Sequence, residues 1–216
     1  PGVGVVRGRR GQLKRARRVG LHDTPRGTTV APRLRQALAE AVHSVLLEHA
    51  SPCLEGLCWY YAVVGCTVAN ALVGRPRYFL QAGSLWLRPT DPPEHLWVGM
   101  DARDGGLARR EFHAWFVAPW QPATADGRVT VDPERDEVVD LAARYYRDWA
   151  LRFGRAWQRP TRPFLWCAPR DLPEWLRLAA DAEATRQAQL THASPTVQAL
   201  VHDLAQAVLL RLRVAA

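Results

Sequence analysis

The sequence has no apolar run long enough for a membrane span. A transmembrane helix needs roughly 18 or more consecutive apolar residues, and the longest apolar stretch of this chain, residues 57–73, is interrupted by Gly65, Thr67 and Asn70. The N-terminal residues include arginines and glycines rather than the apolar segment of a secretory signal peptide. We therefore expect a soluble, cytoplasmic protein with no membrane partner.

The sequence also lacks the signals of metal and nucleotide sites. Its four cysteines do not form the paired C-x2-C spacing of zinc sites and have no histidine pair beside them. No glycine-rich phosphate loop and no internal repeat is present. Without a secretion signal, a disulfide framework is not expected. We predict that the protein uses neither a metal ion nor an organic cofactor. The cysteines are Cys53, Cys58, Cys66 and Cys167.

Lysine is nearly absent, and the excess positive charge is confined to one end of the chain. The net charge is +8, but residues 1–36 carry ten basic residues and one acidic residue, while the remainder nets −1. A basic segment can bind phosphates or other anionic partners without reading a sequence. We predict that residues 1–30 form a basic, disordered arm and that residues 31–216 form a single domain. The arm has either no specific partner, which we favour, or a nucleic acid or other anionic partner.

Hydrophobic periodicity predicts an α+β fold. Helical spacing of apolar residues marks 32–50, about 57–73, 140–153 and the segment from Pro195 onward. A capping sequence at Asp171-Leu172-Pro173-Glu174 predicts a further helix to about Leu190. Short β-branched and aromatic runs predict strands at 77–88, 95–100, 111–117, 137–141 and 164–167. We expect an antiparallel sheet of four to six strands with the helix of residues 57–73 packed on one face and extra helices at both ends.

The most informative stretch is Gly56-Leu57-Cys58-Trp59-Tyr60-Tyr61-Ala62, which opens the apolar run that Gly74 and Pro76 close. This arrangement puts Cys58 at or near a helix N-terminus. There the unpaired backbone N–H groups and the positive end of the helix dipole favour the thiolate, the form of cysteine that attacks carbonyls. The alternative is that Cys58 is a small buried core residue.

Two later segments supply the partners that a nucleophilic cysteine needs. His113 lies within an alternating strand pattern, and Asp140 ends a short β-branched run. Cysteine, histidine and carboxylate on separate elements could act as nucleophile, general base and orienting group. His95 is an alternative base, and Asp132 and Asp136 are alternatives for the carboxylate.

With these residues, the sequence resembles a known family. The patterns Gly56-x-Cys58-x-x-Tyr61-Ala62, Gly74-x-Pro76, His113-Ala114-Trp115 and Val-Val-Asp140 are similar to the transglutaminase-like branch of the papain-like cysteine peptidase superfamily. The resemblance covers roughly residues 51–141. It implies a cysteine helix packed on an antiparallel sheet, with the histidine and the aspartate on neighbouring strands. By position it implies that Cys58 is the nucleophile, His113 the base and Asp140 the orienting group.

The sequence departs from that family in two places. The gap between His113 and Asp140 is longer than the usual single hairpin, which is why the two other aspartates stay open as alternatives. No glutamine stands just before Cys58 to stabilise an oxyanion. The backbone N–H of Cys58 and a second donor would do that work, and Gln81 is one candidate.

The function that we expect is thiol-dependent hydrolysis of an amide carbonyl in a peptide or protein substrate. Bacterial members of this branch are often peptidases, including those that remove leader peptides. The alternatives are acyl transfer to an amine by the same triad, and a non-catalytic binding domain with a basic arm that contacts nucleic acid. In a binding domain, a groove lined by Trp157, Trp166 and Trp175 could receive the partner.

Overall fold

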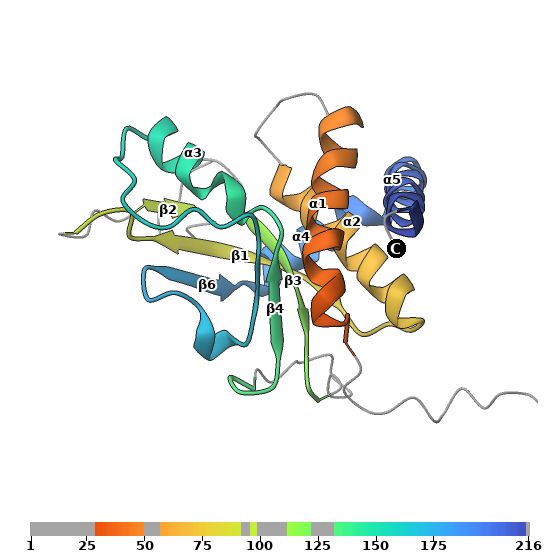
Figure 1. Cartoon of the computed structure of the whole chain (residues 1–216). Coiled ribbons are helices and arrows are strands. Elements are labelled where there is room, and N and C mark those ends of the chain that lie inside the picture. Colours follow the sequence, from red (N-terminus) through yellow and green to blue (C-terminus); the bar gives the residue numbers. More distant parts are fainter. Residues whose placement is uncertain (1–28, 50–56, 92–95, 99–111, 122–131, 215–216) are drawn as a thin grey trace, which may run out of the picture.

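The computed structural model describes residues 29–49, 57–91, 96–98, 112–121 and 132–214. Two helices precede and two helices follow the strands of one antiparallel sheet, so the predicted α+β class is confirmed (Figure 1). In chain order the elements are α1 (Pro32–His49), α2 (Leu57–Val73), β1 (Phe79–Leu87), β2 (Leu96–Val98), β3 (His113–Ala118), β4 (Glu137–Asp140), the 3-10 turn η1 (Ala143–Tyr145), α3 (Tyr146–Arg152), β5 (Leu165–Cys167), the 3-10 turn η2 (Pro169–Asp171), β6 (Leu176–Ala180), α4 (Ala182–Ala193) and α5 (Pro195–Val214).

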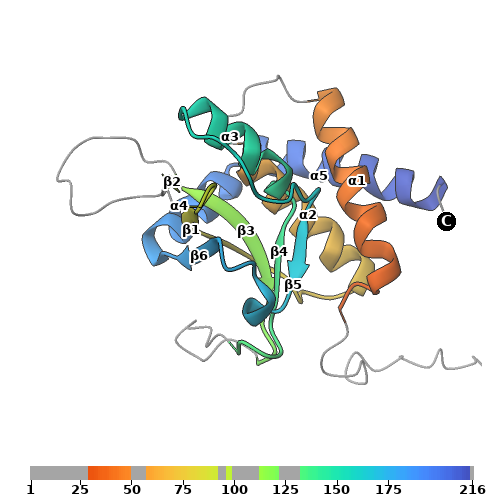
Figure 2. The same ribbon diagram turned by 60° about the vertical axis from the view of Figure 1, so that its left-hand side comes forward.

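The sheet is built around β1. The segment Leu85–Leu87 pairs with both β2 and β6, so these two strands lie on opposite edges of β1. Gly83 pairs with both β3 and β6, so β3 shares its edge with β2. β4 and β5 then extend the sheet beyond β3, and every pair is antiparallel. The strands curl as they cross the molecule (Figure 2).

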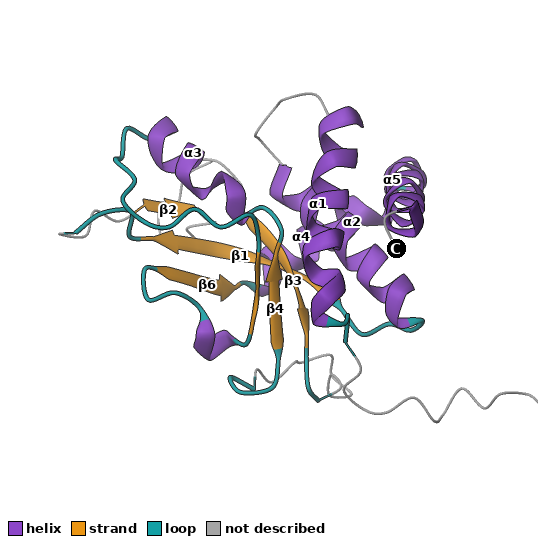
Figure 3. Ribbon diagram, viewed as in Figure 1, coloured by secondary structure: helices purple, strands orange, loops and turns teal. Residues whose placement is uncertain are grey.

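The cysteine helix α2 packs directly against the sheet. A Cβ atom on Gly65 would lie 2.6 Å from Leu141 Cδ1 and 2.9 Å from Phe116 Cε1, so a larger residue would require these side chains to shift. α1 and α5 cover the other side of α2, and all three lie on one side of the sheet (Figure 3). α2 ends where predicted, with Gly74 at φ 73° and its N–H donating to Asn70 O (2.9 Å).

The apolar stretch of α2 belongs to the protein core. Ten of its residues are buried, Cys58 among them. None of the helices in the described part of the chain combines the length and the apolarity that crossing a bilayer requires.

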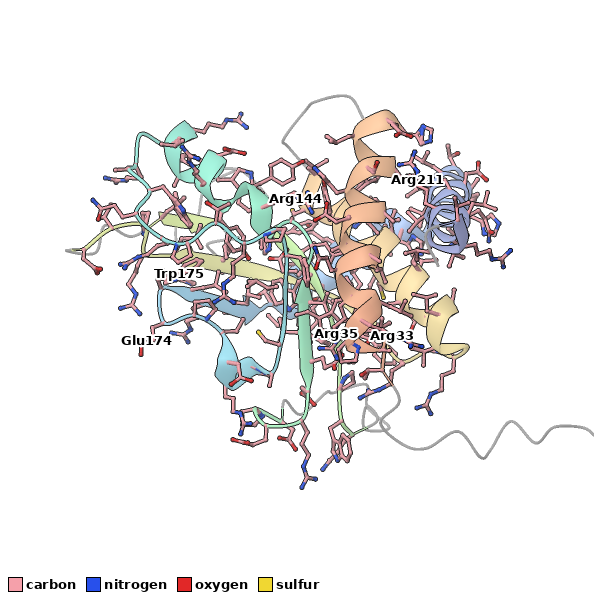
Figure 4. The ribbon with its side chains drawn as sticks, in the orientation of Figure 1. Arg33, Arg35, Arg144, Glu174, Trp175 and Arg211 are labelled. Atoms are coloured by element: carbon pink, nitrogen blue, oxygen red, sulfur yellow. The ribbon has the colours of Figure 1, made fainter. Side chains whose placement is uncertain are left out.

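The segment before α1 is attached to the core. Val30 is buried and its N–H donates to the Tyr78 hydroxyl (2.9 Å), while Thr29 donates to Glu137 (3.1 Å). Arg35, at the start of α1, also donates to Glu137 (2.5 Å; Figure 4). Thr29 and Val30 therefore pack with the domain, although the sequence assigned them to the arm. The rest of the predicted arm lies outside the described residues.

The predicted helix from Asp171 to Leu190 is wrong in its first half. Residues 176–180 form β6 instead, and α4 begins only at Ala182. The N-cap is Asp181, whose carboxylate accepts the Ala184 N–H (2.7 Å).

Gly83 allows β6 to pair with β1 where the helix was predicted. A Cβ atom on Gly83 would lie 2.1 Å from the carbonyl oxygen of Ala179, so glycine permits β6 to approach β1 closely. The edge of β1 would otherwise present unpaired backbone groups, which β6 satisfies. A local capping pattern carries no information about this distant partner strand.

Candidate active site

Cys58 is the second residue of α2 and lies beside the start of β3. The residue is 8% exposed. As a residue of the first helical turn, it has a backbone N–H without a partner inside the helix. Its thiol donates to the carbonyl oxygen of Phe112, the residue just before His113 (Sγ to O 3.7 Å). The packing of α2 on the sheet thus brings the predicted nucleophile beside the strand that carries the predicted base, and the two side chains interact.

His113 and Asp140 form a buried pair. Their exposed fractions are 0% and 1%, and His113 Nε2 donates to Asp140 Oδ2 (2.5 Å). The pairing of β3 with β4, continued by one position, places Asp140 opposite Trp115. His113 is then the diagonal neighbour of Asp140 on the same face of the sheet, within reach of a long side chain.

The Asp140 carboxylate accepts three hydrogen bonds. Besides His113, its Oδ2 accepts the Tyr146 hydroxyl (2.5 Å), and its Oδ1 accepts the Ala142 N–H (2.8 Å). Tyr146 is itself buried. Because three donors replace solvent, the carboxylate is held in one orientation toward the imidazole.

The pKa of His113 is raised to about 10. Burial by itself lowers this pKa, but the charge and the hydrogen bond of Asp140 raise it by more, and the Cys58 thiol adds to the increase. His113 is therefore a positively charged imidazolium at neutral pH. Its Nε2 is engaged by Asp140, whereas its buried Nδ1 has no hydrogen-bond partner among the described residues. Nδ1 is the ring nitrogen that remains for proton exchange with a thiol.

Three aromatic rings enclose the imidazole of His113. Trp115 stacks on it (centroids 6.0 Å apart, 21° between planes), and Tyr146 and Trp149 present edges at 6.0 and 5.5 Å. Trp115 Nε1 in turn donates to Gln81 Oε1 (3.2 Å). Gln81 thus holds the stacking indole in place, and its role as an oxyanion donor stays a prediction. The three rings shield the hydrogen bond between His113 Nε2 and Asp140 from water.

The alternative carboxylates have other partners. Asp136 accepts the N–H groups of Trp120 (2.6 Å) and Asp132 (2.8 Å), and Asp132 accepts the Glu134 N–H (3.0 Å). These bonds close the turn that precedes β4, so neither carboxylate reaches the imidazole. The alternative base, His95, lies outside the described residues.

The other described cysteines have less reactive surroundings. Burial raises the pKa of Cys66 to about 12, and its thiol donates to Tyr78 O (3.3 Å). Burial and then the charge of Asp171 raise the pKa of Cys167. Both thiols are free, and Cys53 lies outside the described residues.

Among the residues that the structure describes, no cluster of three or more histidine, cysteine or acidic side chains could hold a metal ion.

Sequence reasoning did not find Ala142 and Tyr146. The bond from the Ala142 N–H to Asp140 had a local signal, since aspartate often accepts from the backbone two residues on. Tyr146 had none, because its contact depends on how α3 turns back over the end of β4.

A second polar cluster lies one helical turn beyond Cys58. The Tyr61 hydroxyl contacts His43 Nδ1 (2.5 Å) and the Tyr145 hydroxyl (3.1 Å). Because Tyr61 has a single proton, the simplest arrangement has Tyr61 donating to a neutral His43 and accepting from Tyr145. Burial, and then the charge of Arg144, lower the pKa of His43.

The three tryptophans that could have lined a groove divide between two places. Trp157 and Trp175 contact each other (centroids 5.5 Å apart). Trp175 also lines a groove of about 440 Å³, together with Trp86, Arg88, Glu174, Leu176 and Arg177. Figure 4 shows Glu174 and Trp175 on the side of the molecule away from α5. Trp166 instead packs against Tyr78 in the core (6.0 Å).

Comparisons with known proteins do not assign a family. No protein-family model matches the chain, and no curated protein sequence matches it. A solved crystal structure described only as a genomics target aligns with 83% of this chain and 78% of its own, at a TM-score of 0.49 and 16% sequence identity.

Proposed function

We propose that this protein is a thiol hydrolase of the transglutaminase-like kind that cleaves an amide bond in a peptide or protein. One observation carries the proposal. A fully buried histidine is anchored through Nε2 by Asp140, has no hydrogen-bond partner for Nδ1 among the described residues, and interacts with the thiol of Cys58 at a helix N-terminus. A cysteine that served only to fill the core would not need a buried, charged imidazole beside it.

The proposed chemistry uses each of these groups. The Cys58 thiolate attacks the carbonyl carbon, and the Cys58 N–H helps to stabilise the oxyanion that forms. His113 gives its proton to the leaving amine and becomes neutral, while Asp140 keeps the imidazole oriented. The acyl group is then bound to the sulfur. Neutral His113 next takes a proton from a water molecule, whose oxygen attacks the thioester and releases the acid and the thiolate.

The rate of Cys58 alkylation against pH tests the activated thiol. We expect iodoacetamide to modify Cys58 with a rate plateau that extends well below pH 8.5, near which an ordinary thiol titrates. His113→Ala should abolish the plateau, whereas replacing the exposed His202 of α5 by alanine should leave it unchanged. Mass spectrometry separates Cys58 from the other thiols. If Cys58 reacts like a free thiol in the intact protein, the catalytic assignment fails and the binding-domain alternative replaces it.

An activated ester distinguishes hydrolysis from transfer. With p-nitrophenyl acetate we expect a burst of nitrophenol and an acetyl group on Cys58, neither of which Cys58→Ser should give. Adding an amine such as glycine methyl ester then partitions the acyl-enzyme. Release mainly as acetate supports the hydrolase, and release mainly as the acetylated amine supports a transferase with the same triad.

A further inference from the structure

Tyr146 begins α3 and reaches the end of β4. Its hydroxyl donates to Asp140 Oδ2 (2.5 Å), the same oxygen that accepts the His113 N–H (2.5 Å). Tyrosine, aspartate and histidine therefore form a continuous buried chain whose last member, His113, interacts with the Cys58 thiol. A phenylalanine would fill the same space, so packing does not explain the hydroxyl.

We propose that Tyr146 is a positioning residue that acts through Asp140 to set how strongly His113 holds its proton, an inference that rests on the proposed function. Two donors that share one carboxylate oxygen also share its negative charge. The more of that charge the Tyr146 hydroxyl neutralises, the less remains to stabilise the imidazolium. Tyr146 thus keeps His113 acidic enough to release its proton to the leaving amine.

The surroundings fix Tyr146 in this role. Its ring contacts the rings of His113 (6.0 Å), Trp149 (5.8 Å) and Trp175 (6.5 Å), so it cannot turn its hydroxyl to another acceptor without disturbing the core. Burial and then the charge of Asp140 raise the pKa of Tyr146 well above its ordinary value. The phenol consequently remains a neutral donor over the pH range in which His113 works.

The adjacent residue provides a matched control. Tyr145 carries the same side chain, but its hydroxyl contacts Tyr61 (3.1 Å) rather than Asp140. Tyr145→Phe removes one hydroxyl from the same turn and leaves the carboxylate untouched. Any general effect of losing a tyrosine hydroxyl near α3 should appear in both variants.

The experiment is a nitrogen-15 NMR titration of the His113 imidazole in the full-length protein. We expect Tyr146→Phe to raise the midpoint of His113 by about 0.5 to 1 pH unit, the size that one lost hydrogen bond implies. Tyr145→Phe should leave the midpoint unchanged. Site-specific replacement of Tyr146 by 3-fluorotyrosine, a stronger hydrogen-bond donor, should lower the midpoint instead. It also serves as the test if the phenylalanine variant does not fold.

Two results would overturn the inference. One is a midpoint that does not move in either Tyr146 variant, and the other is an equal shift in Tyr146→Phe and Tyr145→Phe. The alkylation profile of the unmodified protein reports separately on the proposed function. An activated Cys58 together with an unmoved midpoint would reject the role of Tyr146 alone, whereas an ordinary Cys58 would reject the hydrolase itself.

Discussion

Two histidines contact tyrosine and lie beside the same helix, yet their proton affinities are shifted in opposite directions. His113 lies beside Cys58 in the first turn of α2, and its pKa is raised to about 10. His43 lies beside Tyr61, one turn later, and its pKa is lowered. Burial lowers the pKa in both cases. The difference comes from the neighbouring charges, because His113 faces the carboxylate of Asp140 and His43 faces the guanidinium of Arg144.

The comparison shows how this fold separates a charged imidazole from a neutral one. Arg144 lies on the α1 side of η1 (Figure 4), where it also approaches Glu40 (3.6 Å), and Glu40 partly offsets its effect on His43. Asp140 lies three residues before η1, at the end of β4. A single chain reversal thus places a negatively charged carboxylate beside one histidine and a positively charged guanidinium beside the other. In our proposal only the charged imidazole has a catalytic role.

Removing the carboxylate should have the largest effect. We expect Asp140→Asn to leave His113 neutral at neutral pH, because burial then acts without the opposing charge. Alkylation of Cys58 at pH 6 should fall on the order of 10²-fold or more, since the thiolate loses its charged partner. Iodoacetamide kinetics and the NMR titration of His113 measure the two effects.

Asp148→Asn is the control for that change. Asp148 is exposed on α3, so its replacement alters the net charge equally without touching the imidazole. An Asp140→Asn protein that keeps both the low-pH reactivity and the high midpoint of His113 would show that Asp140 is not what distinguishes the two histidines.

The stability of the protein should change with pH in a way that Asp140 controls. A raised pKa means that the folded state keeps a proton that the unfolded chain loses above about pH 6.5. The stabilisation from His113 is therefore complete below pH 6.5 and disappears as the pH rises toward 10. In Cys58→Ala, where no thiol gives up a proton to offset the one that His113 keeps, we expect the free energy of unfolding to fall by roughly 1 kcal/mol per pH unit between pH 7 and 9 relative to the double variant Cys58→Ala/Asp140→Asn. Urea unfolding at each pH measures this difference, and parallel curves for the two proteins would contradict it.

Much of the site could be predicted because its signals are local. Gly74 marks the C-terminal end of the α2 apolar run, which places Cys58 near its N-terminal end. The alternation of side-chain types around His113 marks a strand. No local signal distinguishes Asp140 from Asp132 and Asp136, because the partner of His113 is decided by the register between β3 and β4. The same limit applies to β6, whose position depends on the close approach that Gly83 allows, and to Tyr146, which reaches Asp140 only because α3 folds back.

The smallest expected effect is the contribution of His43 to the loss of folding stability at low pH. A lowered pKa means that, below about pH 6.5, the unfolded chain takes up a proton that folded His43 resists, so stability is lost as the pH falls. Protonation would also remove the lone pair that accepts the Tyr61 hydroxyl. We expect His43→Gln to lose less stability than the unmodified protein between pH 7.5 and 5.5.

His49→Gln, an exposed change on the same helix, is the control and should behave like the unmodified protein. The difference should be small because His43 is only partly buried and solvent screens its neighbours. If both substitutions respond to acid alike, the lowered proton affinity of His43 does not contribute to stability, and the contrast with His113 rests on Asp140 alone.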